Sequence, residues 1–433
     1  MAKQLEVWLL GAHIGTLAQL DGRLSFGYAA EWLAKGAAGD GLKTEAVPLS
    51  QSLPLRTEPF DDRTTRPFFA GLLPEGDKRK LVAQALQVSR QNDFALLDGI
   101  GGECAGAVTL LEPGQTPALI DAPDTVRWLD DAQLLAVLDE MPQRPMLVGD
   151  EGLRLSLAGA QDKLPVVAEG ERIGLPLFGS PSSHILKPPI AGAEGSVFNE
   201  GFCMALAAAL KLDVAKTQIH QVGARQYLLV ERYDRHGQSR LHQEDFCQAL
   251  GTAPETKYQN EGGPNLAQSF ELLRRATRPS APHILKLLDF VVFNALIGNH
   301  DAHGKNFSLL YTPKGAVLAP LYDALCTAVY PRLTDKMAMK IGSKYKFSEV
   351  QARHWEQFAI DAVLSPAQVK KRILDMARRL PALASATRAR FEAQGNSHPI
   401  LAQIVTLIDQ RCALTIRRLT ASNADDGLPT QAS

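Results

Sequence analysis

The chain has 433 residues, of which 45% are hydrophobic and 21% are charged, and its formal net charge is −1. This length can bury a large core and predicts two or three domains. Acidic and basic residues nearly balance, so the composition excludes nonspecific electrostatic binding to nucleic acid through a high net positive charge. We therefore expect direct DNA binding by this chain alone to be weak.

The N-terminus alternates apolar and polar residues over 5–20 around a turn at Gly11, which predicts a β-hairpin rather than a signal sequence. No later apolar run approaches the roughly 20 residues of a membrane span, so we expect no membrane association. The cysteines are widely spaced with no C-x-x-C pair, which indicates reduced thiols in a cytoplasmic protein. They are Cys104, Cys203, Cys247, Cys326 and Cys412.

The predicted elements divide the chain into five parts. Short strands, Gly/Pro turns and one helix near 78–88 come first, and a Pro-rich stretch follows. A small lobe of strands and helix comes next, with the helix over 202–210. Apolar residues at helical spacing follow it, as in 284–293 and 367–379. The expected parts are an α+β subdomain (1–112), a connector (113–147), a small lobe (148–232), a mainly helical large lobe (233–420) and a disordered tail (421–433).

Two features of the small lobe could contact phosphate. In the loop 154–163, the small residues Ala158, Gly159 and Ala160 would let backbone N–H groups approach an anion, although such a run also suits an ordinary turn. The apolar strand 183–187 ends in Lys187, which either points into water or holds a phosphate.

Asp301 and Asn306 lie in the pattern D-x-x-x-x-N, and Asp323 follows after two short strands around a Pro/Gly turn. Protein kinases place a catalytic Asp and a metal-binding Asn at this spacing and supply a second metal-binding Asp from a later element. A hairpin would return Asp323 to Asn306. The order predicts phosphoryl transfer from ATP, in which Asp301 accepts a hydroxyl proton while Asn306 and Asp323 hold Mg²⁺.

Several longer motifs together resemble the HipA family, the serine/threonine kinase toxins of bacterial toxin–antitoxin modules. The similarity spans about residues 1–400 and implies an α+β, bilobal, protein-kinase-like fold. The motifs are FFAGLLPEG (68–76), SLAGAQDK (156–163), HILKPP (184–189), VERYDR (230–235), QEDFCQALG (243–251), IGNHDAHGKNFSLL (297–310) and LYDA (321–324).

The resemblance implies roles for individual residues. Asp301 corresponds to the catalytic base, Lys187 to the lysine that holds the ATP phosphates, and Ser156 to an autophosphorylated loop serine. Glu231 and Tyr233 correspond to the hinge that binds adenine. The implied ATP-binding set is Ser156, Leu157, Ala158, Gly159, Ala160, Lys187, Glu231, Tyr233, His303, Gly304, Lys305, Asn306, Tyr322 and Asp323, with Asn306 and Asp323 as Mg²⁺ ligands.

Two points stay open within this assignment. Either Glu200 or Glu194 could pair with Lys187, and Glu200 could equally be a first-turn acid that favours the helix dipole. Ser156 could simply cap a turn; alternatively, a phosphate there would add about two negative charges and pull the loop away from ATP, by repulsion or by recruiting Arg154.

The chain also departs from the general kinase pattern. His300 replaces the usual Arg before the catalytic Asp, and Asp323-Ala-Leu replaces Asp-Phe-Gly, so activation by an ordinary phosphorylated loop is not expected. Two other motifs are interpreted as structural: 99–104 as a turn, and 243–251 as a short helix that ends at Gly251.

The family resemblance further implies a HipB-like helix-turn-helix antitoxin as partner, operator DNA reached through that antitoxin, and an aminoacyl-tRNA synthetase, such as glutamyl-tRNA synthetase, as substrate. Three alternatives remain: an inactive scaffold on DNA with the antitoxin, a small-molecule phosphotransferase, and a metal-dependent phosphohydrolase. The last would use His300, Asp301 and His303 as metal ligands.

Overall fold

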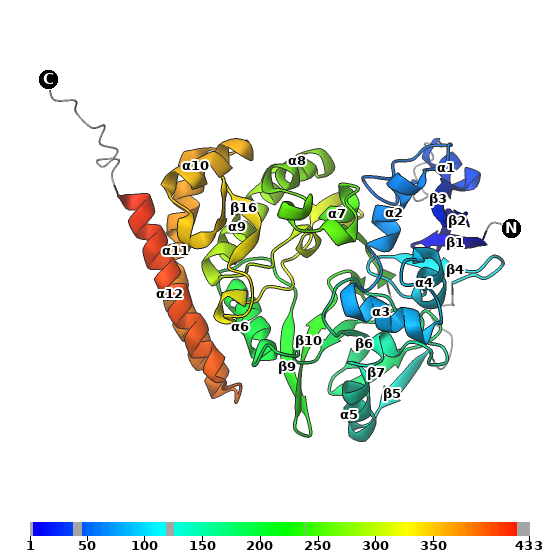
Figure 1. Cartoon of the computed structure of the whole chain (residues 1–433), viewed down its shortest axis with the longest axis horizontal. Coiled ribbons are helices and arrows are strands. Elements are labelled where there is room, and N and C mark those ends of the chain that lie inside the picture. The colour runs from blue at the N-terminus through cyan, green and yellow to red at the C-terminus, as the bar shows by residue number, and fades with distance from the viewer. Residues whose placement is uncertain (1–2, 38–45, 118–124, 238, 422–433) are drawn as a thin grey trace.

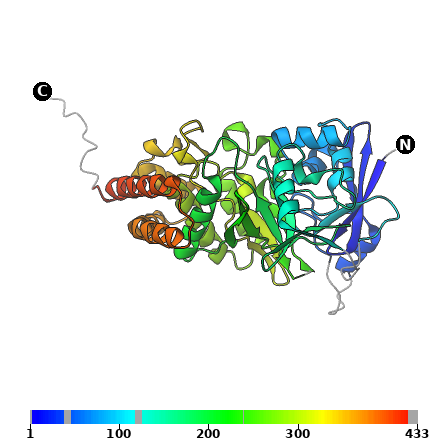
Figure 2. The ribbon, with the colours of Figure 1, turned by 90° about the horizontal axis from the view of Figure 1, so that it is seen from below.

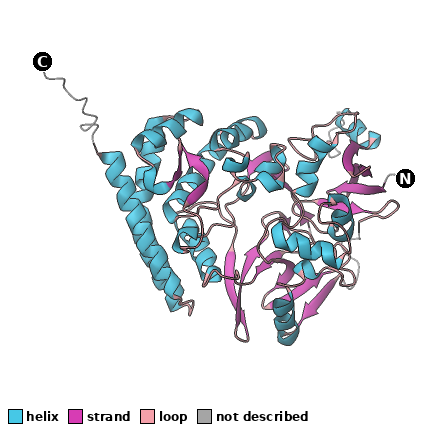
Figure 3. Cartoon of the chain, viewed as in Figure 1, coloured by secondary structure: helices cyan, strands magenta, loops and turns pink. Residues whose placement is uncertain are grey.

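The computed structural model describes residues 3–37, 46–117, 125–237 and 239–421. The predicted disordered tail lies outside the described residues, except for Ala421. The molecule is elongated, with the N-terminal strands at one end and two long helices at the other (Figure 1). Strands and helices are mixed in the centre and at the N-terminal end, whereas the C-terminal end is mainly helical (Figure 3).

The N-terminal unit is a four-stranded antiparallel sheet with the order β3-β2-β1-β4, flanked by helices. The predicted hairpin is confirmed, with Gly11 at φ +77° in its turn. Gly99 lies inside the last helix of this unit, so the turn predicted over 99–104 begins too early. The elements are β1 (Lys3–Leu9), β2 (Ala12–Leu20), β3 (Arg23–Tyr28), β4 (Val108–Leu111), α1 (Ala30–Ala37), α2 (Asp62–Ala70), α3 (Gly76–Ala85) and α4 (Asp93–Ile100).

The small lobe is a six-stranded sheet with the order β5-β7-β6-β8-β10-β9, in which all neighbours are antiparallel. Its edge strand β5 and helix α5 come from the stretch predicted to be a connector. The helix predicted over 202–210 begins earlier, at Ser196. The elements are β5 (Val126–Leu129), β6 (Leu164–Glu169), β7 (Arg172–Pro176), β8 (His184–Lys187), β9 (Thr217–Val222), β10 (Arg225–Glu231), α5 (Asp131–Glu140), α6 (Ser196–Ala209) and the 3-10 helix η1 (Pro145–Leu147).

The large lobe is built around α9 (Ala281–Ile297), which is apolar on nearly all sides and therefore buried. The predicted strands and Pro/Gly turn after Asn306 form β14 (Ser308–Thr312) and β15 (Gly315–Leu318), which pair with each other, and β14 also pairs with β13 (His242–Asp245). Residues 243–245 are therefore strand, and the predicted helix there is limited to α7 (Phe246–Ala249), ending before Gly251 at φ +67°.

The remaining elements of this lobe are short strands, single 3-10 turns and longer helices. They are β11 (Arg235–His236), β12 (Ser239–Arg240), β16 (Lys336–Ile341), β17 (Lys344–Lys346), η2 (Pro254–Thr256), η3 (Gln259–Glu261), η4 (Gly304–Asn306), η5 (Thr327–Val329), η6 (Phe347–Glu349), α8 (Leu266–Ala276), α10 (Ala352–Asp361), α11 (Pro366–Ala393) and α12 (Pro399–Thr420).

Helices α11 and α12 lie side by side at the C-terminal end (Figure 2). Among the described helices, α12 alone is long and apolar enough to cross a membrane by length and composition, which qualifies the expectation that no apolar run approaches that length. Its residues Leu401, Ile404 and Ile408 are fully buried, and the helix packs on α6, α9 and α11. One face of α12 is therefore buried and the other is exposed, as in an amphipathic helix at the surface of a domain.

A buried ion cluster joins the N-terminal unit to the hinge after β10. The Glu103 carboxylate accepts hydrogen bonds from Arg232 at 2.9 Å and from Arg235 at 2.8 Å, and Asp234 pairs with Arg232 at 2.8 Å. All four side chains are almost completely buried. Because unpaired charges at this depth would be costly, the cluster holds the two units in one arrangement.

Candidate active site

One cavity of about 1050 Å³ lies where the small lobe, the large lobe and the N-terminal unit meet. Nearly all of the predicted site residues line it, and Ser156 and Gly304 are the exceptions. The predicted residues that line it are Leu157, Ala158, Gly159, Ala160, Lys187, Glu231, Tyr233, Asp301, His303, Lys305, Asn306, Tyr322 and Asp323.

The loop that carries Asp301 starts where α9 stops. Gly298 adopts φ +80°, a conformation that glycine reaches without strain, and it ends the helix. The Tyr258 hydroxyl donates a hydrogen bond to Asp301 Oδ1 at 2.6 Å, and the Asp301 N–H donates to Asn299 Oδ1 at 3.1 Å. Burial raises the pKa of Asp301, while the Tyr258 hydrogen bond and the charge of Lys257 oppose this rise. The carboxylate is thus oriented and suited to accept a proton.

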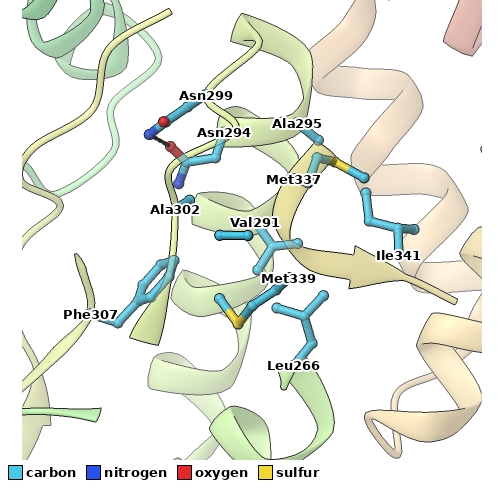
Figure 4. A pocket seen from close by; sticks show the side chains of 11 residues that line it. Leu266, Val291, Asn294, Ala295, Asn299, Ala302, Phe307, Met337, Met339 and Ile341 are labelled. Atoms are coloured by element: carbon cyan, nitrogen blue, oxygen red, sulfur yellow. Dashed lines mark hydrogen bonds between the residues drawn. The ribbon is translucent and has the colours of Figure 1, made fainter. Parts of the chain in front are cut away.

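Asn299 is itself hydrogen-bonded to the helix that precedes it. Its Nδ2 donates to Asn294 Oδ1 on α9 at 2.8 Å, above a small apolar pocket that Val291, Phe307 and Met339 line (Figure 4). This pocket measures about 30 Å³, which is room for no more than a water-sized group. The pocket is therefore a packing gap beneath the loop, not a ligand site.

His300 is committed to structural contacts. Its Nδ1 lies 3.0 Å from the Thr334 carbonyl oxygen, and its Nε2 lies 2.8 Å from the Arg411 guanidinium. Burial and the charge of Arg411 lower the pKa of His300, so the ring stays neutral, donating from Nδ1 and accepting at Nε2. Because both ring nitrogens are occupied, His300 has no lone pair free for a metal, which counts against the phosphohydrolase interpretation.

The hairpin brings Asp323 back to Asn306, as predicted: Asn306 Nδ2 donates to Asp323 Oδ2 at 3.0 Å. Lys187 Nζ lies 2.6 Å from Asp323 Oδ1 and 2.6 Å from Glu200 Oε1. This settles the choice of partner in favour of Glu200. Glu194 precedes α6, and its backbone carbonyl oxygen accepts a hydrogen bond from the Tyr330 hydroxyl at 3.2 Å.

These contacts control the charges at the site. Burial alone would raise the pKa of Asp323, but Lys187 and Lys163 outweigh it and hold this pKa well below its usual range. Burial lowers the pKa of Lys163 to about 8, and the charge of Lys187 adds to this effect. Asp323 is therefore an anion in a positively charged corner of the cavity, as a residue that faces polyphosphate and cations should be.

The pair Asn306 and Asp323 fits a magnesium site in its chemistry. Both supply hard oxygen ligands, and Mg²⁺ in nucleotide enzymes usually takes only one or two protein carboxylates beside substrate phosphates. In this structure Asn306 turns Nδ2 toward Asp323, while its Oδ1 accepts from the His303 N–H at 3.2 Å. Rotation of the amide would present Oδ1 instead. The two residues would hold the cation, which would neutralise charge on the phosphates.

The loop 154–163, called the covering loop below, lines the cavity through residues 157–160 and is hydrogen-bonded to the N-terminal unit. Gly159 adopts φ +115°, which favours glycine, and its carbonyl oxygen accepts from the Glu75 N–H at 3.0 Å. Ser156 lies beneath the loop, fully buried, where its Oγ donates to the Leu72 carbonyl oxygen at 2.8 Å. Ser156 is therefore a buried anchor of this loop and does not line the cavity.

The predicted hinge residues also lie at the cavity. The N–H groups of Glu231 and Arg232 donate to the carbonyl oxygens of Lys216 and Ser183 at 2.9 and 3.0 Å, so they are not available to adenine. The ring of Tyr233 lies against that of Tyr322, with centroids 5.5 Å apart. The hinge therefore contributes an aromatic ring to the lining of the cavity.

Two residues of the implied ATP-binding set, Gly304 and Lys305, make structural contacts. Gly304 is packed against Cys247 and Pro264, where a Cβ atom would come within 2.8 Å of both side chains. Lys305 Nζ contacts Asp245 at 3.0 Å and the Gly71 carbonyl oxygen at 3.1 Å, and the charges of Asp245 and Glu75 raise its pKa despite burial. Lys305 therefore stabilises the loop between Asp301 and Asn306 through contacts inside the protein.

Sequence reasoning missed several residues at the cavity. Glu75, Lys257 and Tyr258 line it beside Asp301, and Lys163 lies beside Gly159. The sequence signals for them were weak: Lys163 is the last residue of the motif SLAGAQDK, Glu75 is the second-last residue of FFAGLLPEG, and no pattern marks 257–258.

Comparison with known proteins gives two family matches. Residues 5–111 match the HipA N-terminal domain, and residues 155–384 match the HipA-like C-terminal domain. Y4mE of Sinorhizobium fredii, whose name describes it provisionally as a kinase, is 49% identical over 382 residues, covering 86% of this chain and 89% of Y4mE. The serine/threonine-protein kinase toxin HipA of Shewanella oneidensis is 30% identical over 390 residues, covering 86% of this chain and 87% of that protein.

A solved structure agrees with these matches. The complex of HipA, HipB and operator DNA from Shewanella oneidensis MR-1 contains a chain that matches this one with a TM-score of 0.81 at 27% identity, covering 96% of this chain and 98% of that one. The match confirms the expected α+β, bilobal, kinase-like fold. The chain belongs to the HipA family of serine/threonine kinase toxins.

Proposed function

We propose that this protein is an ATP- and Mg²⁺-dependent serine/threonine protein kinase and the toxin of a toxin–antitoxin module. The observation that carries the proposal is that Asp301, Asn306, Asp323 and Lys187 meet around one cavity in the order that phosphoryl transfer requires. The buried, free cysteines are compatible with action in the cytoplasm.

In this proposal each residue acts mainly by position. Lys187, held by Glu200, fixes the donor phosphates. Asp301, oriented by Tyr258, takes the proton of the incoming hydroxyl as its oxygen attacks the γ-phosphorus and the bond to the β-phosphate oxygen breaks. Asn306 and Asp323 would hold Mg²⁺, which neutralises the charge that develops on the phosphates. The loop 157–160 covers the nucleotide and excludes water.

A solved structure of a relative supports the proposed antitoxin partner. HipA of Shewanella oneidensis forms a complex with HipB and its operator DNA, and we propose that this chain reaches DNA through a HipB-like helix-turn-helix antitoxin. We further propose an aminoacyl-tRNA synthetase, of the glutamyl-tRNA synthetase kind, as the acceptor protein. Autophosphorylation of Ser156 and binding of the antitoxin would silence the enzyme.

The test is transfer of labelled γ-phosphate from Mg-ATP by the protein and by its Asp301→Asn variant, each alone and with a cytoplasmic extract. We expect label on Ser156 and on one extract protein, both lost in the variant. Label on a small metabolite alone would support a small-molecule phosphotransferase instead. Nucleotide binding without any transfer would leave the protein as a scaffold on DNA.

A further inference from the structure

Lys257 lines the cavity beside Tyr258 and lies outside the predicted catalytic motifs. It follows η2 directly, and the next residue, Tyr258, bonds Asp301. Lys257 Nζ lies 2.7 Å from Glu75 Oε2, and each of the two side chains is only 15% exposed. Both line the cavity. The ion pair thus lies at the catalytic aspartate and is largely shielded from solvent.

The other two lysines considered for phosphate binding are already committed. Lys187 is shared between Glu200 and Asp323, on the side of the donor phosphates and the metal ligands. Lys305 is held by Asp245 and by the Gly71 carbonyl oxygen. The one lysine between Asp301 and Asn306 is therefore already bonded within the protein.

Transfer of a phosphoryl group needs positive charge where the equatorial oxygens carry negative charge. Lys257 is the cation nearest in sequence to the residue that holds Asp301, and its charge opposes protonation of both Asp301 and His303. We propose that Lys257 is a further catalytic residue, which contacts the oxygens of the γ-phosphoryl group, and that Glu75 is its positioning residue. This inference rests on the proposed kinase function.

Glu75 belongs to the N-terminal unit, outside the kinase-like lobes. Its side chain holds Lys257, while its backbone N–H donates to the carbonyl oxygen of Gly159 at the tip of the covering loop. A weaker contact of 3.6 Å joins its other carboxylate oxygen to Lys305. One residue of the N-terminal unit thus touches the covering loop and two cations of the large lobe, and the active site is incomplete without this unit.

The test measures binding, so that it does not depend on turnover. Calorimetry gives the affinities for Mg-ATP and Mg-ADP of the full chain and of Lys257→Met, Lys257→Arg, Glu75→Gln and Lys344→Met. Lys344 pairs with Glu349 at 3.0 Å, and neither residue lines the cavity, so Lys344→Met removes a lysine–glutamate pair elsewhere. Thermal unfolding shows that each variant is folded.

We expect Lys257→Met to bind Mg-ATP about tenfold more weakly with little change for Mg-ADP, because only ATP carries the γ-phosphate. Lys257→Arg should retain most of the preference for Mg-ATP over Mg-ADP. Glu75→Gln should reduce this preference, and Lys344→Met should leave it unchanged. Equal loss for ATP and ADP, or no loss in Lys257→Met, would overturn the inference. If γ-phosphate transfer to protein nevertheless occurs in the intact chain, the proposed function survives; if the intact chain binds no nucleotide, both fail.

Discussion

Ser156 Oγ donates a hydrogen bond to the Leu72 carbonyl oxygen at 2.8 Å, joining the covering loop to the N-terminal unit. The Ser156 N–H also donates, to the Glu103 carbonyl oxygen at 2.9 Å. The side chain is fully buried. A phosphate on Oγ would remove the donor that Leu72 needs and would bring negative charge against a carbonyl oxygen, so the closed loop cannot accommodate it.

We therefore predict that Ser156→Asp binds Mg-ATP at least about tenfold more weakly than the unmodified protein, because the loop leaves the cavity. Ser156→Ala should retain much of the affinity, since the loop keeps its backbone bond to Glu103. Limited proteolysis should cut the loop 154–163 faster in Ser156→Asp. Unchanged ATP affinity in that variant would refute this account.

Recruitment of Arg154, the second route considered from the sequence, is less favoured by the structure. Arg154 already donates to the Asp98 carbonyl oxygen at 2.5 Å, on α4. The loss of the Ser156–Leu72 bond therefore suffices to open the loop without a new arginine contact.

The core of the site could be predicted because its signals are local. The spacing of Asp301 and Asn306, and the turn residues between β14 and β15, place Asp323 beside Asn306 within a short stretch of chain. The buried pattern of β8 likewise fixes Lys187 at the end of a central strand. Each of these predictions depended on secondary structure that the nearby residues determine.

Contacts between segments that are distant in the sequence could not be predicted from such local patterns. Glu200, rather than Glu194, meets Lys187 because α6 begins at Ser196 and turns Glu200 toward β8, and the sequence placed this start too late. Glu75 and Lys257 are 182 residues apart in the chain. Their contact depends on how the N-terminal unit docks on the large lobe, which no spacing encodes.

Tyr258→Phe should impair catalysis without impairing nucleotide binding. Its hydroxyl orients Asp301 at 2.6 Å and lowers the pKa of that carboxylate. Removing it lets the pKa of Asp301 rise, so the acid limb of the pH–rate profile should move to higher pH, because the base must be ionised. We expect kcat at neutral pH to fall about tenfold while KM for ATP changes little.

Tyr311→Phe is the matched control for this variant. Tyr311 is a tyrosine whose hydroxyl donates to a carboxylate, that of Glu244, away from the cavity. The acid limb should stay in place in Tyr311→Phe. An unmoved acid limb in Tyr258→Phe would show that its hydrogen bond does not tune Asp301.

The last prediction concerns stability at mild acid pH and His242, which is buried where the N-terminal unit meets the large lobe. Its Nε2 donates to the Leu49 carbonyl oxygen at 2.8 Å, and its ring stacks on Tyr311 with centroids 5.2 Å apart. Burial lowers the pKa of His242 to about 4, against about 6.5 for an unfolded histidine. The unfolded chain therefore takes up the proton first as the pH falls.

The stabilisation from neutral His242 is complete above about pH 6.5 and is lost as the pH falls toward 4, which makes the free energy of unfolding about 2 kcal/mol lower at pH 5 than at pH 7.5 through this group. His242→Gln keeps a donor for Leu49 and does not titrate, so its unfolding free energy, measured by urea denaturation, should vary less over this range, whatever its absolute value. Glu244, whose pKa burial raises to about 7, contributes the opposite slope in both proteins and cancels in the difference. Parallel pH profiles for the two proteins would exclude His242 as the source of acid sensitivity.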